Sequence, residues 1–109
     1  MRTFYHATSK ENLANILENG LKAGYEGCVY ITEKEDEAVR FLAVRLVPEI
    51  VTFKIRIHKK DYDKIQETFD HNQRFFKCRA FGYFGNIEVK DIEASKVYEN
   101  PLVKKDKIV

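Results

Sequence analysis

The stretch YHATSKENLANILENGL, residues 5–21, decides the fold, because it passes from a strand-prone run into a helix with a clear start and end. Thr8 and Glu11 have the spacing of a capping box, in which each side chain satisfies a free backbone donor at the start of a helix. Gly20 suits the left-handed position that ends one. We therefore predict a helix over 9–19. Its apolar face is formed by Leu13, Ile16 and Leu17.

A second segment, GCVYIT at residues 27–32, repeats this order of strand and helix. Residues 28–31 predict a short strand, and Thr32 with Glu35 again has capping-box spacing. The helix that follows should run to about Leu46, since Pro48 stops it. We expect its buried face to consist of Ala38, Val39, Leu42 and Leu46, with Phe41 at the edge.

The second half of the chain reads mainly as strands. Residues 50–58 alternate apolar and polar side chains, which predicts a half-exposed strand. Less regular predictions follow: a weak helix or irregular connection at 60–69, a β-prone run at 74–84, a turn or short helix at 87–92 and a last strand at 96–98. Because helices come early and strands late, we expect an α+β fold with mixed or antiparallel sheets. One domain would cover residues 1–99, with a frayed tail over 100–109.

Composition excludes several classes of protein. The chain has 109 residues, 44% hydrophobic and 33% charged, which suits one globular domain. No apolar run reaches the roughly 20 residues of a membrane helix, and the polar start MRTFYH is unlike a signal peptide. Cys28 and Cys78 form neither a disulfide framework nor a zinc set. We therefore expect a cytoplasmic protein with reduced thiols and no membrane association.

Charge is small overall but unevenly placed. The net charge is +2, yet residues 50–87 carry 8 basic and 4 acidic groups, a sum of +4. This part of the chain could meet an anion such as a phosphate, or it could be a solvated face. The pI of about 8.5 is below the strongly basic balance typical of nucleic-acid-binding domains.

Few residues carry a chemical signal. The glycines make no phosphate-binding loop, and the three histidines lack metal-ligand spacing. What stands out is His6, at a strand end beside free helix N–H groups, and Tyr30, whose ring offers a flat face to a heterocycle. Either residue alone is more often structural.

Together these segments resemble the ADP-ribosyltransferase superfamily of the His–Tyr type, with distant similarity to RNA 2′-phosphotransferases and poly(ADP-ribose) polymerase cores. The family's first strand carries His, a small residue and Ser/Thr, followed by a helix ending in "GL" and a strand "GxYxT". The resemblance covers residues 4–45 well. It covers 50–92 loosely, through the long strand and the run GYFGNIEVKDI. It implies split β-sheets with two helices in the N-terminal half and a cleft between the sheet halves.

The resemblance also implies roles for individual residues. His6 would hold the ribose of NAD, the backbone of Ala7 would contact the nicotinamide amide, and Thr8 would support it. Tyr30 would stack on the nicotinamide ring. The activity implied is NAD-dependent transfer of ADP-ribose to a macromolecular acceptor, either protein or nucleic acid.

The sequence departs from the family pattern in two places. Ala7 stands where family members usually have Gly. The glutamate that opens the last core strand falls near Arg79, Ala80 or Phe81, none of which is acidic. Glu88, the nearest downstream carboxylate, is the candidate for its catalytic role, and Arg79 is a candidate to bind a phosphate of the cofactor.

These departures keep three alternatives open. One is a module of the same fold that binds NAD or ADP-ribose without turnover. Another is a phosphotransferase-like protein that grips an RNA phosphate through Lys54, Arg56, Arg74 and Arg79. The third is a small protein that binds nucleic acid through residues 54–60 and 74–79.

Overall fold

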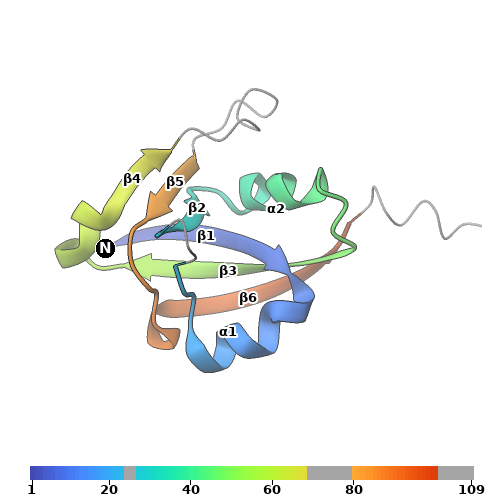
Figure 1. The fold of residues 1–109 in the computed structure, drawn as a ribbon, viewed down its shortest axis with the longest axis horizontal. Coiled ribbons are helices and arrows are strands. Elements are labelled where there is room, and N and C mark those ends of the chain that lie inside the picture. Colours follow the sequence, from blue (N-terminus) through green and yellow to red (C-terminus); the bar gives the residue numbers. More distant parts are fainter. Residues whose placement is uncertain (24–26, 69–79, 101–109) are drawn as a thin grey trace, which may run out of the picture.

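The computed structural model describes residues 1–23, 27–68 and 80–100, which form an α+β fold around one six-stranded antiparallel sheet (Figure 1). The strand order is β4-β5-β2-β1-β3-β6. The strands are β1 (Arg2–Ser9), β2 (Val29–Thr32), β3 (Glu49–Ile57), β4 (Ile65–Thr68), β5 (Ala80–Tyr83) and β6 (Ile92–Glu99). The helices are α1 (Leu13–Asn19) and α2 (Glu35–Ala43), with 3-10 turns η1 (Lys10–Asn12), η2 (Lys59–Lys64) and η3 (Val89–Asp91). The predicted α+β class is confirmed. The described strands form one sheet, so the split β-sheets that the resemblance implies are not confirmed.

The most extensive pairing in the sheet is that of β1 with β3. These strands pair along the whole of β1, from Arg2 opposite Ile57 to Ser9 opposite Ile50. The predicted strand over 50–58 is confirmed within a residue, and Val51, Phe53, Ile55 and Ile57 are buried as expected. Ile50 and Thr52 on the other face are buried as well, so the strand is less exposed than predicted. By contrast, β1 pairs with β2 only where Tyr5 lies opposite Thr32. The sheet is therefore joined tightly on one side of β1 and loosely on the other.

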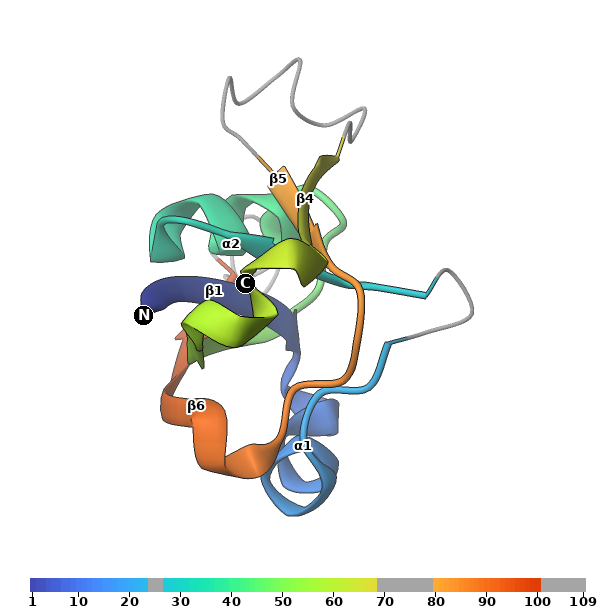
Figure 2. The same ribbon diagram turned by 90° about the vertical axis from the view of Figure 1, so that its left-hand side faces the viewer.

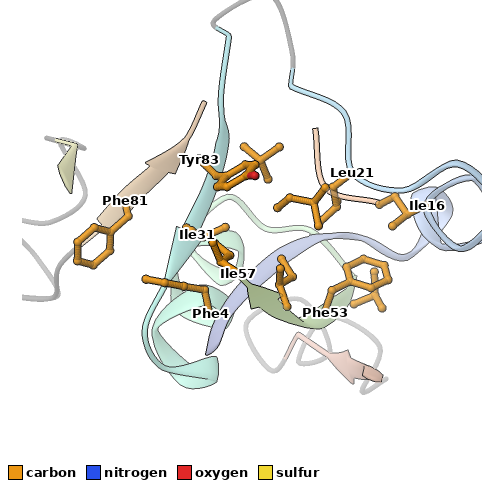
Figure 3. Packing of buried hydrophobic residues seen from close by; sticks show 12 residues of the cluster. Phe4, Ile16, Leu21, Ile31, Phe53, Ile57, Phe81 and Tyr83 are labelled. Atoms are coloured by element: carbon orange, nitrogen blue, oxygen red, sulfur yellow. The ribbon is translucent and has the colours of Figure 1, made fainter. Parts of the chain in front are cut away.

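The two helices cover opposite faces of the β1–β3 pair (Figure 2). On one face Ile16 of α1 packs with buried side chains from β1, β2, β3 and β5 in the main core (Figure 3). Within this core the rings of Phe4 and Phe81 meet edge to face, 5.5 Å apart. On the other face Ala38 of α2 packs on Ala7 and Ile50. Tyr5 and Leu42 extend this smaller cluster.

Neither predicted capping box forms. β1 continues through Ser9 because its ladder with β3 reaches Ile50, so Thr8 is a strand residue and α1 begins only at Leu13. Ser9 and Lys34, which precede the first helical turns, make no side-chain capping bond. The carboxylate of Glu35 instead accepts hydrogen bonds from Thr52 Oγ1 at 2.9 Å and Tyr98 OH at 2.5 Å. This glutamate therefore ties α2 to the sheet.

The end of α2 also differs from the prediction. The helix stops at Ala43, and the following turn carries Leu46 to a φ of 58° with 60% of its surface exposed. Phe41, expected at the edge, is buried with Ala38. The helix is one turn shorter than expected. Leu46 therefore does not belong to its buried face, and Phe41 does.

The C-terminal half contains more strand than predicted. Residues 65–68 form β4, and β6 begins at Ile92 rather than at 96. β6 shows no clear alternation because it is a sheet-edge strand whose residues are mostly exposed. The frayed-tail prediction is wrong at Asn100, which is buried and whose Nδ2 donates to the carbonyls of Ala43 and Val47. The remaining predictions for 69–79 and 101–109 lie outside the described residues.

Gly20 ends α1 as predicted, with a φ of 80° and its N–H donating to Ile16 O at 2.8 Å. Its ψ of −175° places it in a region that essentially only glycine adopts. A Cβ added there would meet Ile87 O at 2.4 Å. We expect Gly20→Ala to lower the free energy of unfolding by at least about 2 kcal/mol, measured by urea denaturation.

Gly27→Ala is the matched control for this prediction. Gly27 has a similar φ of 82°, but a Cβ there meets nothing within 4 Å. A smaller loss of stability in Gly27→Ala would isolate the contact with Ile87. Equal losses in the two variants would contradict it.

Candidate functional site

The candidate site lies at the seam between β1 and β2, where the two strands pair least. His6 follows Tyr5, the one residue of β1 that pairs with β2. Its Nδ1 lies 2.7 Å from the backbone oxygen of Tyr30. Since a carbonyl oxygen only accepts, Nδ1 must carry the proton and donate. The imidazole thus takes the place of a missing ladder hydrogen bond and satisfies Tyr30 O.

This bond fixes the chemistry of the other ring nitrogen. Burial lowers the pKa of His6, and the hydrogen bond to Tyr30 O offsets this only in part. The ring is therefore neutral at pH 7, with its proton on Nδ1 and a lone pair on Nε2. His6 makes no second hydrogen bond with the described residues. Nε2 is available to accept one from a ligand.

A cavity of about 120 Å³ adjoins the seam. Its walls come from β1, β2 and one side of α2, and most of its lining is apolar: Tyr5, Ala7, Ile31, Ala38, Phe41 and Leu42. His6, Tyr30, Thr32 and Arg45 supply the polar groups. Sites for drug-sized ligands measure roughly 300–1,000 Å³. This cavity therefore accommodates a single ring, and the rest of a larger ligand would lie on the surface.

His6 and Tyr30 reach the cavity from different faces of the sheet. Strand alternation assigns His6 to the face of Phe4, and Tyr30 to the face opposite Val29 and Ile31. Tyr30 is 46% exposed. Because the ladder is interrupted here, both residues line one cavity. The seam, rather than one sheet face, brings the two predicted residues together.

The other predicted site residues are placed differently. Ala7 is buried and lines the cavity. Thr8 does not line it, and its Oγ1 accepts a hydrogen bond from Asn12 Nδ2 at 3.0 Å. Glu88 lines a separate cavity, where it precedes η3 and pairs with Lys90 at 3.3 Å. Arg79 lies outside the described residues.

No described residue that lines the seam cavity is acidic. Ala80 and Phe81, where the family's glutamate would fall, have no carboxylate. Ala80 opens β5, and Phe81 lies in the main core. Of the alternative phosphate ligands, Lys54 and Arg56 both pair with Glu93 of β6, at 3.6 and 3.1 Å, and do not line the cavity.

Sequence reasoning missed Arg45. It lies in the turn after α2, where its N–H donates to Leu42 O at 3.1 Å, and its side chain lines the cavity. It makes no ion pair with any residue that the structure describes. The sequence gives no signal for this role, because a helix running to Leu46 leaves Arg45 as one more solvated cation.

The lowered pKa of His6 predicts an acid-sensitive fold. The unfolded chain takes up a proton near pH 6.5, whereas the folded chain resists it until a lower pH. The His6-dependent part of the stability is therefore intact above pH 6.5. It is lost as the pH falls from 6.5 toward the folded-state pKa, by at most about 1.4 kcal/mol per pH unit.

Urea denaturation at several pH values measures this loss. His6→Asn should remove the His6-dependent slope, because asparagine does not titrate. His58→Gln should leave it in place. An unchanged slope in His6→Asn would contradict the assignment of a neutral, partly buried imidazole.

Comparison with known proteins does not assign the site, because neither a protein-family model nor a curated protein matches the chain. In the parts of the chain that are described, no helix has the length and apolar character needed to cross a membrane. Within the same parts, no cluster of three or more His, Cys, Asp or Glu residues could hold a metal ion.

Proposed function

We propose that the chain binds NAD at the seam cavity and transfers its ADP-ribose unit to a macromolecular acceptor, as its resemblance to the ADP-ribosyltransferases implies. The observation that carries this proposal is the bond between His6 Nδ1 and Tyr30 O. It leaves Nε2 as a pure acceptor, which matches the hydroxyl donors of a ribose. A phosphate offers no such donor when ionised, so the site favours the sugar.

The rest of the cavity fits the remaining parts of the ligand. Its apolar walls and its size suit the nicotinamide ring, and Tyr30 lines the cavity with an aromatic side chain of the kind that stacks on such a ring. The loose pairing of β1 with β2 supports the proposal, because the resemblance implies a cleft at such a place, although the described strands form one sheet. Arg45 at the rim is a cation that can meet the pyrophosphate.

The transfer needs positioning more than a protein nucleophile. The bond between ribose C1′ and the nicotinamide nitrogen breaks, and its electron pair leaves with the neutral nicotinamide. The positive charge then resides on an oxocarbenium-like ribose. The acceptor attacks this ribose at C1′, and the acceptor atom then loses its proton to solvent. His6 would hold the ribose, and Tyr30 would hold the departing ring in line with it.

A second candidate is binding of NAD or ADP-ribose without turnover. The observation that favours it is the lack of a carboxylate among the described residues of the cavity wall. A carboxylate would hold a ribose hydroxyl and polarise the acceptor in a transferase of this type. Binding alone needs only the acceptor atom of His6, the Tyr30 ring and Arg45.

Two measurements separate the candidates. Calorimetry with NAD and ADP-ribose tests binding, and incubation with labelled NAD and a cell extract tests transfer. Binding with labelling of a protein or nucleic acid supports the transferase, and binding without labelling supports the second candidate. Absence of binding to either nucleotide would contradict both.

Arg45 provides a prediction that depends on the ligand's phosphates. We expect Arg45→Gln to weaken NAD binding about threefold to tenfold, since an exposed cation interacts with an anion through solvent. Nicotinamide riboside, which has no phosphate, should bind both proteins equally. Titration calorimetry at two salt concentrations measures the difference, which should shrink at high salt.

The matched control is Arg40→Gln. Arg40 lies on α2 but pairs with Asp36 at 3.1 Å and does not line the cavity. An equal loss of NAD affinity in both variants would show that the general charge of the helix, rather than Arg45, attracts the ligand.

A further inference from the structure

A second and larger cavity, of about 320 Å³, opens at the other end of the molecule. Its walls are the end of β3, η2, the end of β5 and η3, and Figure 2 looks onto this end. None of its lining residues lines the seam cavity. Its volume falls within the range of small-molecule sites.

Tyr83 points to a ligand for this cavity. The residue is only 5% exposed, and its ring belongs to the main core (Figure 3). It also lines the cavity, yet its hydroxyl makes no hydrogen bond with the described residues. The hydroxyl is not sealed from solvent, so it faces the open space of the cavity, where a ligand can accept its proton. Burial, together with the nearby Asp61, raises the pKa of Tyr83, so the hydroxyl keeps its proton and can donate.

The charged groups of the wall are mostly paired with one another. His58 Nε2 lies 2.7 Å from Asp91 Oδ1, and Lys64 Nζ lies 3.3 Å from Asp61 Oδ1. Lys60 lines the same cavity and has no ion-pair partner in the described part of the chain. The wall therefore combines carboxylate acceptors, several donors and one cation without a counter-charge.

We propose that this cavity is a second ligand site, which takes a small phosphorylated sugar. Lys60 would meet the phosphate, the carboxylates of Asp61 and Asp91 would accept hydrogen bonds from sugar hydroxyls, and the Tyr83 hydroxyl would donate to a sugar or phosphate oxygen. A bare anion fits less well, because three carboxylates, Asp61, Glu88 and Asp91, line the cavity beside its cations. An apolar ligand would leave these polar groups unpaired. The site does not depend on NAD binding at the seam.

Calorimetry on the full chain with ribose 5-phosphate tests this site, with ribose as the comparison. Ribose 5-phosphate should bind, and ribose should bind at least fivefold more weakly, because it lacks the group that meets Lys60. Tyr83→Phe keeps the buried ring and removes only the hydroxyl, so it should weaken binding about threefold to tenfold. Lys60→Gln should have an effect of similar size.

Two control variants make the result decisive. Lys59→Gln removes the neighbouring lysine of η2, which does not line the cavity, and should leave binding unchanged. His6→Asn should also leave it unchanged. Equal losses in Lys59→Gln and Lys60→Gln, no loss in Tyr83→Phe, or no binding of ribose 5-phosphate would each overturn the site. A loss in His6→Asn alone would place the sugar phosphate at the seam and likewise overturn it.

Discussion

Replacing His6 by asparagine is expected to weaken NAD binding about tenfold to hundredfold and to lower the rate of ADP-ribose transfer at least as much. The side-chain amide of asparagine can still donate to Tyr30 O, as Nδ1 does at 2.7 Å. It has no acceptor where Nε2 stood, so a ribose hydroxyl loses its partner. An unsatisfied buried donor costs roughly 1–3 kcal/mol, which corresponds to this loss of affinity.

His6→Gln is the matched variant for this experiment. Glutamine can place an acceptor oxygen near the position of Nε2, so it should recover part of the affinity that asparagine loses. Calorimetry with NAD, together with an unfolding curve for each variant, measures both effects. Equal affinity in the original protein and in folded His6→Asn would contradict the proposed site.

Replacing Phe53 by alanine is expected to have the largest effect on stability. Phe53 lies on β3, between β1 and β6, is 0% exposed and packs in the main core (Figure 3). Emptying such a position costs roughly 3–5 kcal/mol. Small domains are stable by about 5–15 kcal/mol, so this change removes a large share of the total. Urea denaturation at pH 7 measures the loss.

Val97→Ala is the control for the core prediction. Val97 lies on the edge strand β6 and is 43% exposed. We expect its replacement to change the free energy of unfolding by less than about 0.5 kcal/mol. Comparable losses in Phe53→Ala and Val97→Ala would contradict the placement of the core between β3 and α1.

The sequence predicts best where a pattern reports burial directly. The alternation over 50–58 reflects one face of β3 against the core, and the structure contains this strand within a residue. Gly20 was also predictable, because a helix end with positive φ selects glycine. The α+β class follows from the order of such segments.

Local signals failed where tertiary contacts compete with them. Thr8 and Glu11 have the spacing of a capping box, yet pairing with β3 holds Thr8 in a strand. Glu35 is drawn to Thr52 and Tyr98, which are distant in sequence. The edge strand β6 is exposed on most of its length, so no periodicity marked its start.

The candidate site was predictable only in part. His6 and Tyr30 were singled out as chemical groups, and the structure brings them to one cavity. The means by which they meet, an interrupted ladder and a ring-to-carbonyl hydrogen bond, depends on strand register and cannot be read from spacing. Arg45 and Tyr83 carry no sequence signal. A single sequence does not distinguish an arginine that lines a cavity from a solvated one, or a tyrosine whose hydroxyl faces a cavity from an ordinary core tyrosine.

The most direct test of the proposed site is the ¹⁵N spectrum of the His6 imidazole, recorded with and without NAD. We predict a neutral ring with its proton on Nδ1, as the hydrogen bond to Tyr30 O requires. Saturation with NAD should shift the Nε2 resonance and leave the proton on Nδ1. A proton on Nε2, or no change at His6 when NAD is saturating, would contradict the account.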